Sequence, residues 1–163
     1  IPFKGRFIHA FNQTPMGYGL PAAMGAAGAH PGRVICLTGD GGLSENITEF
    51  ATIAKHNMNI KTILFNNRGH AMCRASQRQW LDAQYHATSA KDLATPNFSA
   101  VAKAYGMNCT NIIGELFDSP PGPAWLEIKV GEEFGVEPQA RFGFPIQDQE
   151  PSLPRDELAR IMA

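Results

Sequence analysis

Short apolar runs alternate with segments of helical periodicity along most of the chain. The apolar runs at residues 33–38, 61–65 and 124–130 are each followed by glycine or asparagine, which is typical of buried strands. Apolar residues spaced three and four apart predict helices at 46–54 and 98–105. Pro21 in a first turn and the small residues after it favour a helix at 19–30, and we also expect a short helix at 155–162 and a partly helical stretch at 71–85. Because strands and helices alternate, we predict an α/β fold built on a parallel sheet.

Local signals refine three of these helices. Asn46 is followed three residues later by Glu49, a spacing that predicts a capping pair at the start of a helix. Asn97, after a proline, is expected to open the helix at 98–105. In the stretch 71–85 we expect Trp80 and Leu81 to be the apolar anchors.

The composition changes near residue 131, where the chain becomes polar and rich in proline. We therefore expect one domain at residues 1–130 and a tail at 131–163 that packs on it or on a domain outside this sequence. The chain starts at Ile1 without an initiator methionine, and we expect it to be part of a longer polypeptide.

Charge and cysteine content narrow the functional classes. The 163 residues carry a formal net charge of −1, which argues against a nucleic-acid-binding or anionic-membrane protein. No apolar run approaches the ~20 residues of a membrane helix. Cys36, Cys73 and Cys109 are odd in number and far apart, so we expect no disulfide framework or zinc ribbon and predict a cytoplasmic location.

The first candidate for chemistry is Gly39-Asp40-Gly41-Gly42, directly after a predicted strand. Glycines let backbone N–H groups approach a phosphate at the start of a helix. An aspartate there would repel the phosphate unless a cation lay between them, which makes Asp40 a candidate Mg²⁺ ligand. The alternative is an ordinary turn, in which glycine and aspartate are common.

The second candidate is Asn66-Asn67-Arg68-Gly69, at the end of the next predicted strand. Open α/β sheets bind ligands at the carboxyl ends of their strands, and an asparagine oxygen is a suitable Mg²⁺ donor. The alternative is that the two asparagines only cap a strand or helix.

Together these motifs resemble the GDG…NN signature of thiamine diphosphate (ThDP) enzymes, with 24 residues between the two elements. Residues 16–26, MGYGLPAAMGA, are similar to a segment of the acetohydroxyacid (acetolactate) synthases. The resemblance covers about residues 7–130. It implies the ThDP-binding fold, in which a parallel sheet is sandwiched by helices in three layers.

The resemblance implies two cofactors, ThDP and Mg²⁺, and a set of residues that hold them. The metal ligands would be the Asp40 carboxylate, the Asn67 side chain and the Gly69 backbone carbonyl. The expected cofactor-binding set comprises Thr14, Met16, Gly39, Asp40, Gly41, Gly42, Asn67, Gly69, His70, Ala71 and Met72. Within it, the N–H groups of residues 41, 42, 71 and 72 would hold the diphosphate, Met16 would support the bent cofactor, and the Thr14 carbonyl would accept from the aminopyrimidine. For Met16 and Met72 the alternative is core packing, and for His70 an exposed loop position.

The resemblance also implies what this chain lacks. ThDP enzymes use a glutamate from a separate pyrimidine-binding domain, so we expect no catalytic residue here and no turnover by the isolated chain. The implied reaction is decarboxylation of a small 2-oxo acid, pyruvate first, and ligation of the product to an acceptor. We expect the pyrimidine domain as partner, and a homo-oligomer whose interface includes Phe3, Phe7, Phe11 and residues 19–28.

Other readings remain open. Ser76 stands where authentic acetohydroxyacid synthases have a tryptophan that selects the second substrate, so the acceptor is not predicted. The chain would alternatively be a subunit of a split decarboxylase or a noncatalytic ThDP-binding module. An iron–sulfur oxidoreductase subunit is disfavoured because there is no cysteine cluster, and a Rossmann domain because there is no G-x-G-x-x-G after a strand.

Overall fold

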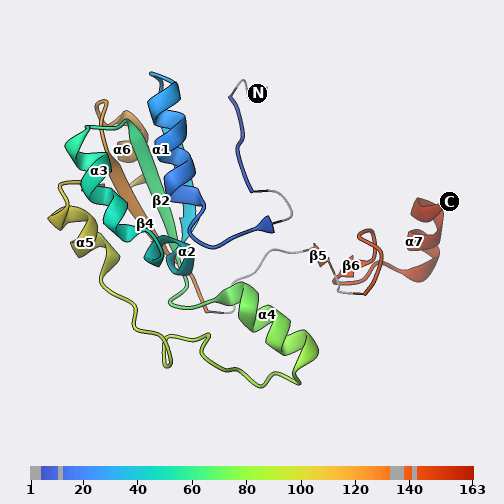
Figure 1. The fold of residues 1–163 in the computed structure, drawn as a ribbon. Helices are drawn as coiled ribbons and strands as arrows, with labels where there is room; N and C mark the ends of the chain where they lie inside the picture. Colours follow the sequence, from blue (N-terminus) through green and yellow to red (C-terminus); the bar gives the residue numbers. More distant parts are fainter. Residues whose placement is uncertain (1–4, 11–12, 133–137, 141–142) are drawn as a thin grey trace. The chain divides into compact units, whose positions relative to one another are not determined.

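The computed structural model describes residues 5–10, 13–132, 138–140 and 143–163. Its chain divides into two compact units, Ile1–Glu133 and Phe134–Ala163. The elements of the first unit are α1 (Gly19–Ala29), β1 (Val34–Gly39), α2 (Asp40–Ser44), the 3₁₀ turn η2 (Ile47–Glu49), α3 (Phe50–Lys55), β2 (Ile60–Asn66), α4 (Ala71–Trp80), α5 (Phe98–Ala104), β3 (Asn108–Thr110), α6 (Ile113–Asp118) and β4 (Ala124–Lys129) (Figure 1). Those of the second are β5 (Gln139–Ala140), β6 (Gln149–Glu150) and α7 (Arg155–Met162).

The first unit is organised around a four-stranded sheet in the order β1-β2-β4-β3. All three strand pairs are parallel, and Gly39 at the end of β1 lies beside Phe65 near the end of β2. The predicted α/β class and parallel sheet are therefore confirmed. The register brings the exits of β1 and β2 to the same edge.

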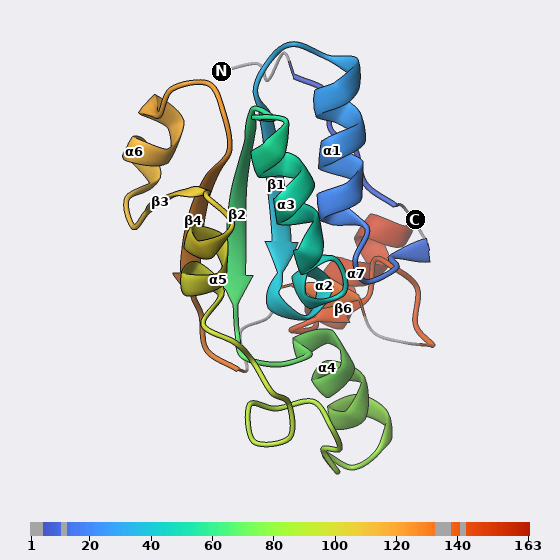
Figure 2. The same cartoon turned by 60° about the vertical axis from the view of Figure 1, so that its left-hand side comes forward.

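Helices pack on both faces of the sheet, but unequally (Figure 2). On one face, α1, α3 and α5 pack over a core that includes Phe50 and Trp125, whose rings meet edge to face with centroids 5.5 Å apart. On the other face α6 contributes Leu116, which packs on Ile63 and Leu126.

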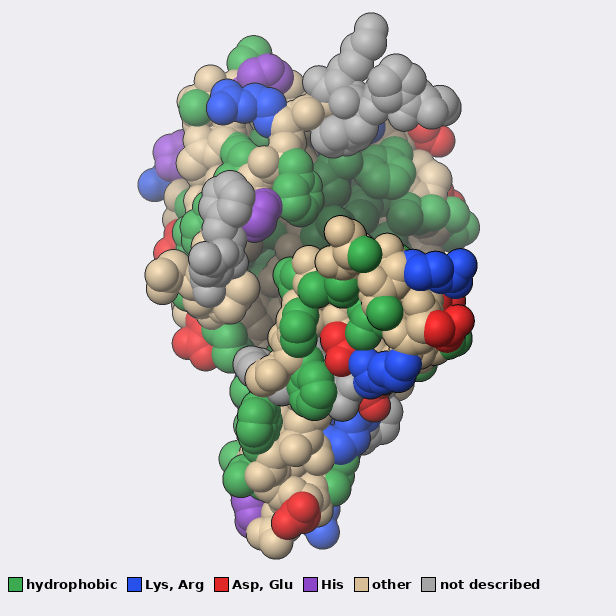
Figure 3. Space-filling model, turned by 90° about the vertical axis from the view of Figure 1, so that its right-hand side faces the viewer, with side chains coloured by type: hydrophobic (Ala, Val, Ile, Leu, Met, Phe, Trp, Pro, Cys, Tyr) green, Lys and Arg blue, Asp and Glu red, His purple; other side chains and the backbone are tan. Residues whose placement is uncertain are grey.

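Part of that second face is open in the described chain. Its alternate strand residues Ile35, Leu37 and Phe65 are 48%, 56% and 39% exposed. Hydrophobic side chains are abundant on the side of the molecule drawn in Figure 3. Of the residues expected at an interface, Phe7 is exposed, whereas Phe3 and Phe11 lie outside the described residues.

The local predictions had mixed outcomes. The Asn97 side chain accepts a hydrogen bond from the Ala100 N–H and opens α5, as expected. The predicted capping pair is wrong, because the Asn46 amide donates instead to the Gly17 carbonyl, 29 residues away. The prediction that Trp80 and Leu81 are apolar anchors is also wrong: they are 59% and 52% exposed, because α4 has no buried residue.

The three cysteines are free, and they differ in burial. Cys36 is 3% exposed on β1, and this burial raises its pKa to about 11 from an ordinary value of 9.0. Cys73 on α4 is exposed. Since the thiolate is the nucleophile, Cys36 is both less accessible and less ionised.

Iodoacetamide at pH 8 is expected to alkylate Cys73 well before Cys36. The raised pKa alone lowers the thiolate fraction of Cys36 about a hundredfold at this pH. Mass spectrometry of the alkylated peptides would measure the two rates, with a denatured sample as control, in which all three cysteines react. Equal rates for Cys36 and Cys73 in the folded chain would contradict the burial of the Cys36 side chain.

Candidate cofactor site at the carboxyl edge of the sheet

Asp40 lies where β1 passes into the short helix α2. Gly39 is still extended, and Asp40 is the first residue of α2. The Asp40 side chain is only 2% exposed although it carries a carboxylate, and its Oδ2 accepts a hydrogen bond from the Gly69 N–H at 2.9 Å. Because α2 has only five residues, its dipole contributes little to anion binding.

The turn after β2 is held by the two asparagines. Asn66 Oδ1 accepts from the Arg68 N–H at 2.9 Å, and Asn67 Oδ1 accepts from the Gly69 N–H at 2.9 Å. The Gly69 N–H is thus shared by the oxygens of Asp40 and Asn67. Two side chains, one after the end of β1 and one after the end of β2, therefore direct oxygen atoms to the same N–H group.

Gly69 is enclosed by the loop that returns from α4. A Cβ at this position would lie 2.4 Å from the Thr88 carbonyl oxygen, and the His70 N–H donates to that oxygen at 3.0 Å. The backbone of Thr88 therefore leaves no room for a side chain at residue 69.

The His70 ring and Met16 lie over Gly41. A Cβ on Gly41 would meet His70 Nδ1 at 2.5 Å and the Met16 methyl at 3.0 Å. Met16 is 49% exposed, so it is not a core residue. The surface in front of Gly41 is thus formed by two of the side chains that the resemblance singled out.

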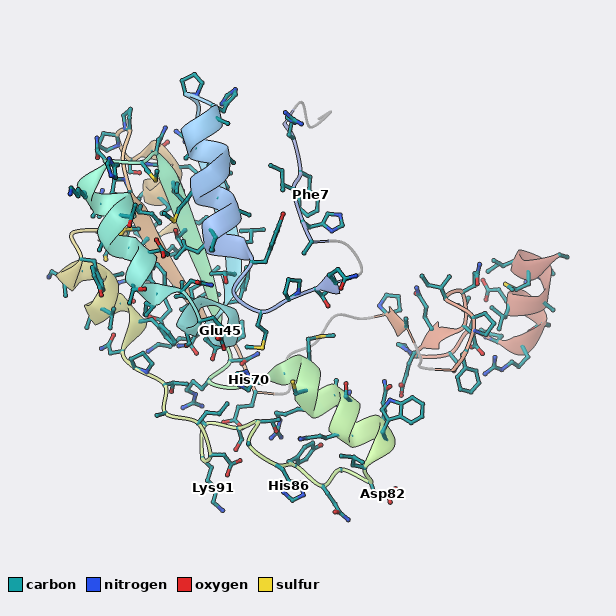
Figure 4. All side chains as sticks on the ribbon, in the orientation of Figure 1. Phe7, Glu45, His70, Asp82, His86 and Lys91 are labelled. Carbon is teal, nitrogen blue, oxygen red and sulfur yellow. The ribbon has the colours of Figure 1, made fainter. Side chains whose placement is uncertain are left out.

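A cavity of about 150 Å³ opens at this place. Four predicted residues line it, together with five that were not predicted: Asp40, Gly41, Gly69 and His70, and Ser44, Glu45, Leu93, Ala94 and Thr95. Figure 4 shows Glu45 beside α2 and His70 at the start of α4. No motif marks residues 93–95, because they reach the cavity only through the fold of the loop after α4.

The other predicted residues are not among those that line this cavity. Ala71 and Met72 form the first turn of α4, where backbone N–H groups have no partner within the helix. Met72 is 80% exposed. Thr14 is exposed and has a positive φ of 36°, and Gly42 packs near the Gly17 backbone.

Gln77 holds the returning loop to α4. Its amide donates to the His86 carbonyl at 3.0 Å, and its oxygen accepts from the His86 N–H and from the Thr88 hydroxyl. The outward side chains of Asp82, His86 and Lys91 mark this loop in Figure 4. Gln77 thereby keeps Thr88 against Gly69, a role that no sequence pattern revealed.

The donors present fit Mg²⁺. This ion prefers carboxylate, amide and carbonyl oxygens, and Asp40, Asn67 and Gly69 offer one of each. A buried carboxylate is costly unless a positive charge faces it. Among the described residues, no group of three or more His, Cys, Asp or Glu side chains is placed to hold a metal ion.

The family model of the thiamine pyrophosphate enzymes, C-terminal TPP-binding domain, matches residues 2–116. The chain belongs to this family. The predicted ThDP cofactor is therefore confirmed, thiamine pyrophosphate being the same molecule, and Mg²⁺ is typical of the family. The resemblance predicted from the two motifs is confirmed as well.

Relatives of this TPP-binding domain are acetolactate synthases. The large subunit from Porphyra purpurea is 37% identical over 137 residues, which cover 78% of this chain and 23% of that protein. The isozyme 1 large subunit from Escherichia coli (strain K12) is 35% identical over 132 residues, covering 76% and 23%. The chain thus spans less than a quarter of the length of these relatives.

A solved structure has the same fold. It is the Rhodococcus jostii RHA1 thiamine diphosphate-dependent 4-hydroxybenzoylformate decarboxylase, with a TM-score of 0.63, 24% identity, and coverage of 71% of this chain and 23% of that chain.

No helix in the described residues of the chain is long and apolar enough to cross a membrane.

Proposed function

We propose that this TPP-binding domain holds the Mg²⁺–diphosphate end of ThDP in an acetolactate synthase-like enzyme. The observation that carries the proposal is the convergence of Asp40 and Asn67 oxygens on the Gly69 N–H. The enzyme would decarboxylate a 2-oxo acid, pyruvate first, and ligate the product to an acceptor. The acetolactate synthases among the relatives support this class of reaction.

Each residue has a definite task in this proposal. Asp40, Asn67 and the Gly69 carbonyl hold Mg²⁺, and the N–H groups of Gly41 and Gly42 bind the diphosphate. A second set completes the site: His70, Ala71 and Met72 at the diphosphate, Gly39 in the loop before it, and Thr14 and Met16 at the pyrimidine and thiazolium rings. When bound, ThDP supplies an electron sink for the carbanion left by decarboxylation.

The proposal assigns the remaining parts to other surfaces. The activating glutamate comes from a pyrimidine-binding domain, which makes the isolated chain inactive, and the enzyme is a cytoplasmic homo-oligomer. In the two-domain arrangement of residues 1–130 and 131–163, the second part packs on the first or on another domain. The exposed apolar side chains Phe7, Ile35 and Leu37 support burial against another surface.

Metal removal tests the cofactor assignment. Titration calorimetry of the chain with ThDP is expected to show weak binding in Mg²⁺ and none in excess EDTA, because the diphosphate and Asp40 repel each other without a cation. Binding that is indifferent to EDTA would contradict the metal assignment. Assay of the full-length gene product with pyruvate separates the enzyme, which turns over, from a noncatalytic ThDP-binding module, which does not.

A further inference from the structure

A hydrogen-bonded chain runs from the core of the sheet to the turn that carries Asn67 and Gly69. The Trp125 indole N–H donates to Ser99 Oγ at 3.1 Å, and the Ser99 hydroxyl donates to Glu127 Oε2 at 2.6 Å. Glu127 Oε1 accepts from Asn66 Nδ2 at 2.8 Å, and Asn66 Oδ1 accepts from the Arg68 N–H. Each link joins a different pair of groups across α5, β4 and β2.

Glu127 decides which end of the Asn66 side chain faces the turn. An ionised carboxylate can only accept hydrogen bonds, so it binds the NH₂ end of the amide. The oxygen end is then left to accept from Arg68. Without the carboxylate nothing opposes rotation of the amide, and in the rotated orientation its NH₂ group would face the Arg68 N–H, donor against donor.

The hydrogen bond to Arg68 matters because the backbone there is unusual. Arg68 has a φ of +58°, a left-handed conformation that a non-glycine residue adopts at a cost. This conformation directs the next N–H, that of Gly69, toward both Asp40 and Asn67. The orientation of Asn66 therefore helps to hold the Gly69 N–H where the Asp40 and Asn67 oxygens can both accept from it.

The Glu127 carboxylate is anchored at its other end by the rigid core. Trp125 is fully buried and packs edge to face on Phe50. The Ser99 hydroxyl, which itself accepts from the Trp125 indole N–H, donates to one carboxylate oxygen, and the second oxygen is left to accept from Asn66. Hydrogen bonds to a charged carboxylate are stronger than those between neutral groups, so they hold the Asn66 amide in one orientation.

We propose that Glu127 is a positioning residue for the metal-binding turn, acting through the amide of Asn66 on Arg68 and Gly69. The proposal rests on the proposed function for its effect on Mg²⁺–ThDP, whereas its effect on the turn itself does not. Glu127 touches neither metal nor cofactor in this scheme. Its contribution is to keep Asn67 and Gly69 in a binding geometry before the cofactor arrives.

The test uses the whole 163-residue chain in two measurements. Hydrogen–deuterium exchange without cofactor follows the amides of residues 66–70, and titration calorimetry follows ThDP binding in Mg²⁺. The single variants are Glu127→Ala, Glu127→Gln and Asn66→Ala, and the double variant combines Glu127→Ala with Asn66→Ala. Glu115→Ala is the matched control, because the Glu115 carboxylate also accepts a hydrogen bond from a hydroxyl group, that of Thr110. Glu115 lies on α6, far in sequence from the turn at residues 66–70.

Glu127→Ala is expected to speed exchange in residues 66–70 about tenfold or more while β1 exchanges as before. Its affinity for Mg²⁺–ThDP should fall about 10- to 100-fold, the usual loss when a group that holds metal ligands is removed. Glu127→Gln retains an acceptor for Asn66 and should restore most of both values. The double variant should bind no more weakly than the weaker single variant, since both act on one path.

Three results would overturn the proposal. One is unchanged exchange in residues 66–70 of Glu127→Ala, and another is faster exchange spread over the whole sheet, which marks a general structural role. The third is an additive loss in the double variant, which excludes the route through Asn66. If the unaltered chain binds no ThDP, the proposed function fails, and the exchange measurement still decides whether Glu127 positions the turn.

Discussion

Replacing Asp40 by asparagine is expected to abolish Mg²⁺-dependent binding of ThDP. The carboxylate is 2% exposed and is the single anionic donor of the proposed metal site. Loss of a direct ligand should cost more than the ~10- to 100-fold typical of a group that only supports one, so we expect at least a hundredfold weaker binding. Titration calorimetry with ThDP in Mg²⁺ measures the effect.

Asparagine is chosen because it separates charge from shape. Its side-chain oxygen can still accept from the Gly69 N–H, so the turn should keep its conformation and the chain without cofactor should melt within a few degrees of the unaltered one. An unchanged melting temperature together with lost binding identifies the charge as the cause. If Asp40→Asn binds ThDP as tightly as the unaltered chain, Asp40 is a turn residue and no metal ligand.

Replacing Gly69 by alanine is expected to disrupt the same site by a different cause. The new Cβ would lie 2.4 Å from the Thr88 carbonyl oxygen, and this is backbone that cannot rotate away. The turn or the returning loop must therefore shift, at a cost of roughly 1–3 kcal/mol in the free energy of unfolding. The shift separates the Gly69 N–H from Asp40, so we expect ThDP binding in Mg²⁺ to fall about tenfold or more. Denaturant unfolding and calorimetry measure the two effects.

The matched control is Gly25→Ala in α1. Apart from the neighbouring backbone of α1, no atom of the described residues lies within 4 Å of the position that a Cβ would take there, and the residue is exposed. Because glycine is unfavourable inside a helix, this change should stabilise the chain by up to ~1 kcal/mol and leave binding unaltered. A Gly69→Ala chain as stable and as competent in binding as Gly25→Ala would show that Thr88 does not enclose the turn.

Local patterns were sufficient for most of the strands and helices. The helix Arg155–Met162 has the predicted bounds, and Asn97 opens α5 as its position before an apolar repeat suggested. The strand Asn108–Thr110 was not predicted, since three residues are too few to show a periodicity. The helix Ile113–Asp118 was not predicted either.

The wrong predictions share a cause, which is competition from distant parts of the chain. Asn46 has the spacing of a helix cap, yet the Gly17 carbonyl binds its amide. Trp80 has the character of an anchor, yet α4 offers it no core to enter, so it stays 59% exposed. Neither outcome depends on residues within one helical turn, and a local pattern carries no information about it.

For the candidate site, the donor types follow from the sequence, which places a carboxylate, an amide and glycines after two strands in an order of motifs that the family shares. The contacts among them follow from the fold, in which Asp40 and Asn67 share the Gly69 N–H, Thr88 closes over Gly69, and Glu127 binds Asn66. This division arises because donor type is a property of single residues. The meeting of donors depends on the strand order β1-β2-β4-β3 and on side-chain packing between segments as many as 61 residues apart.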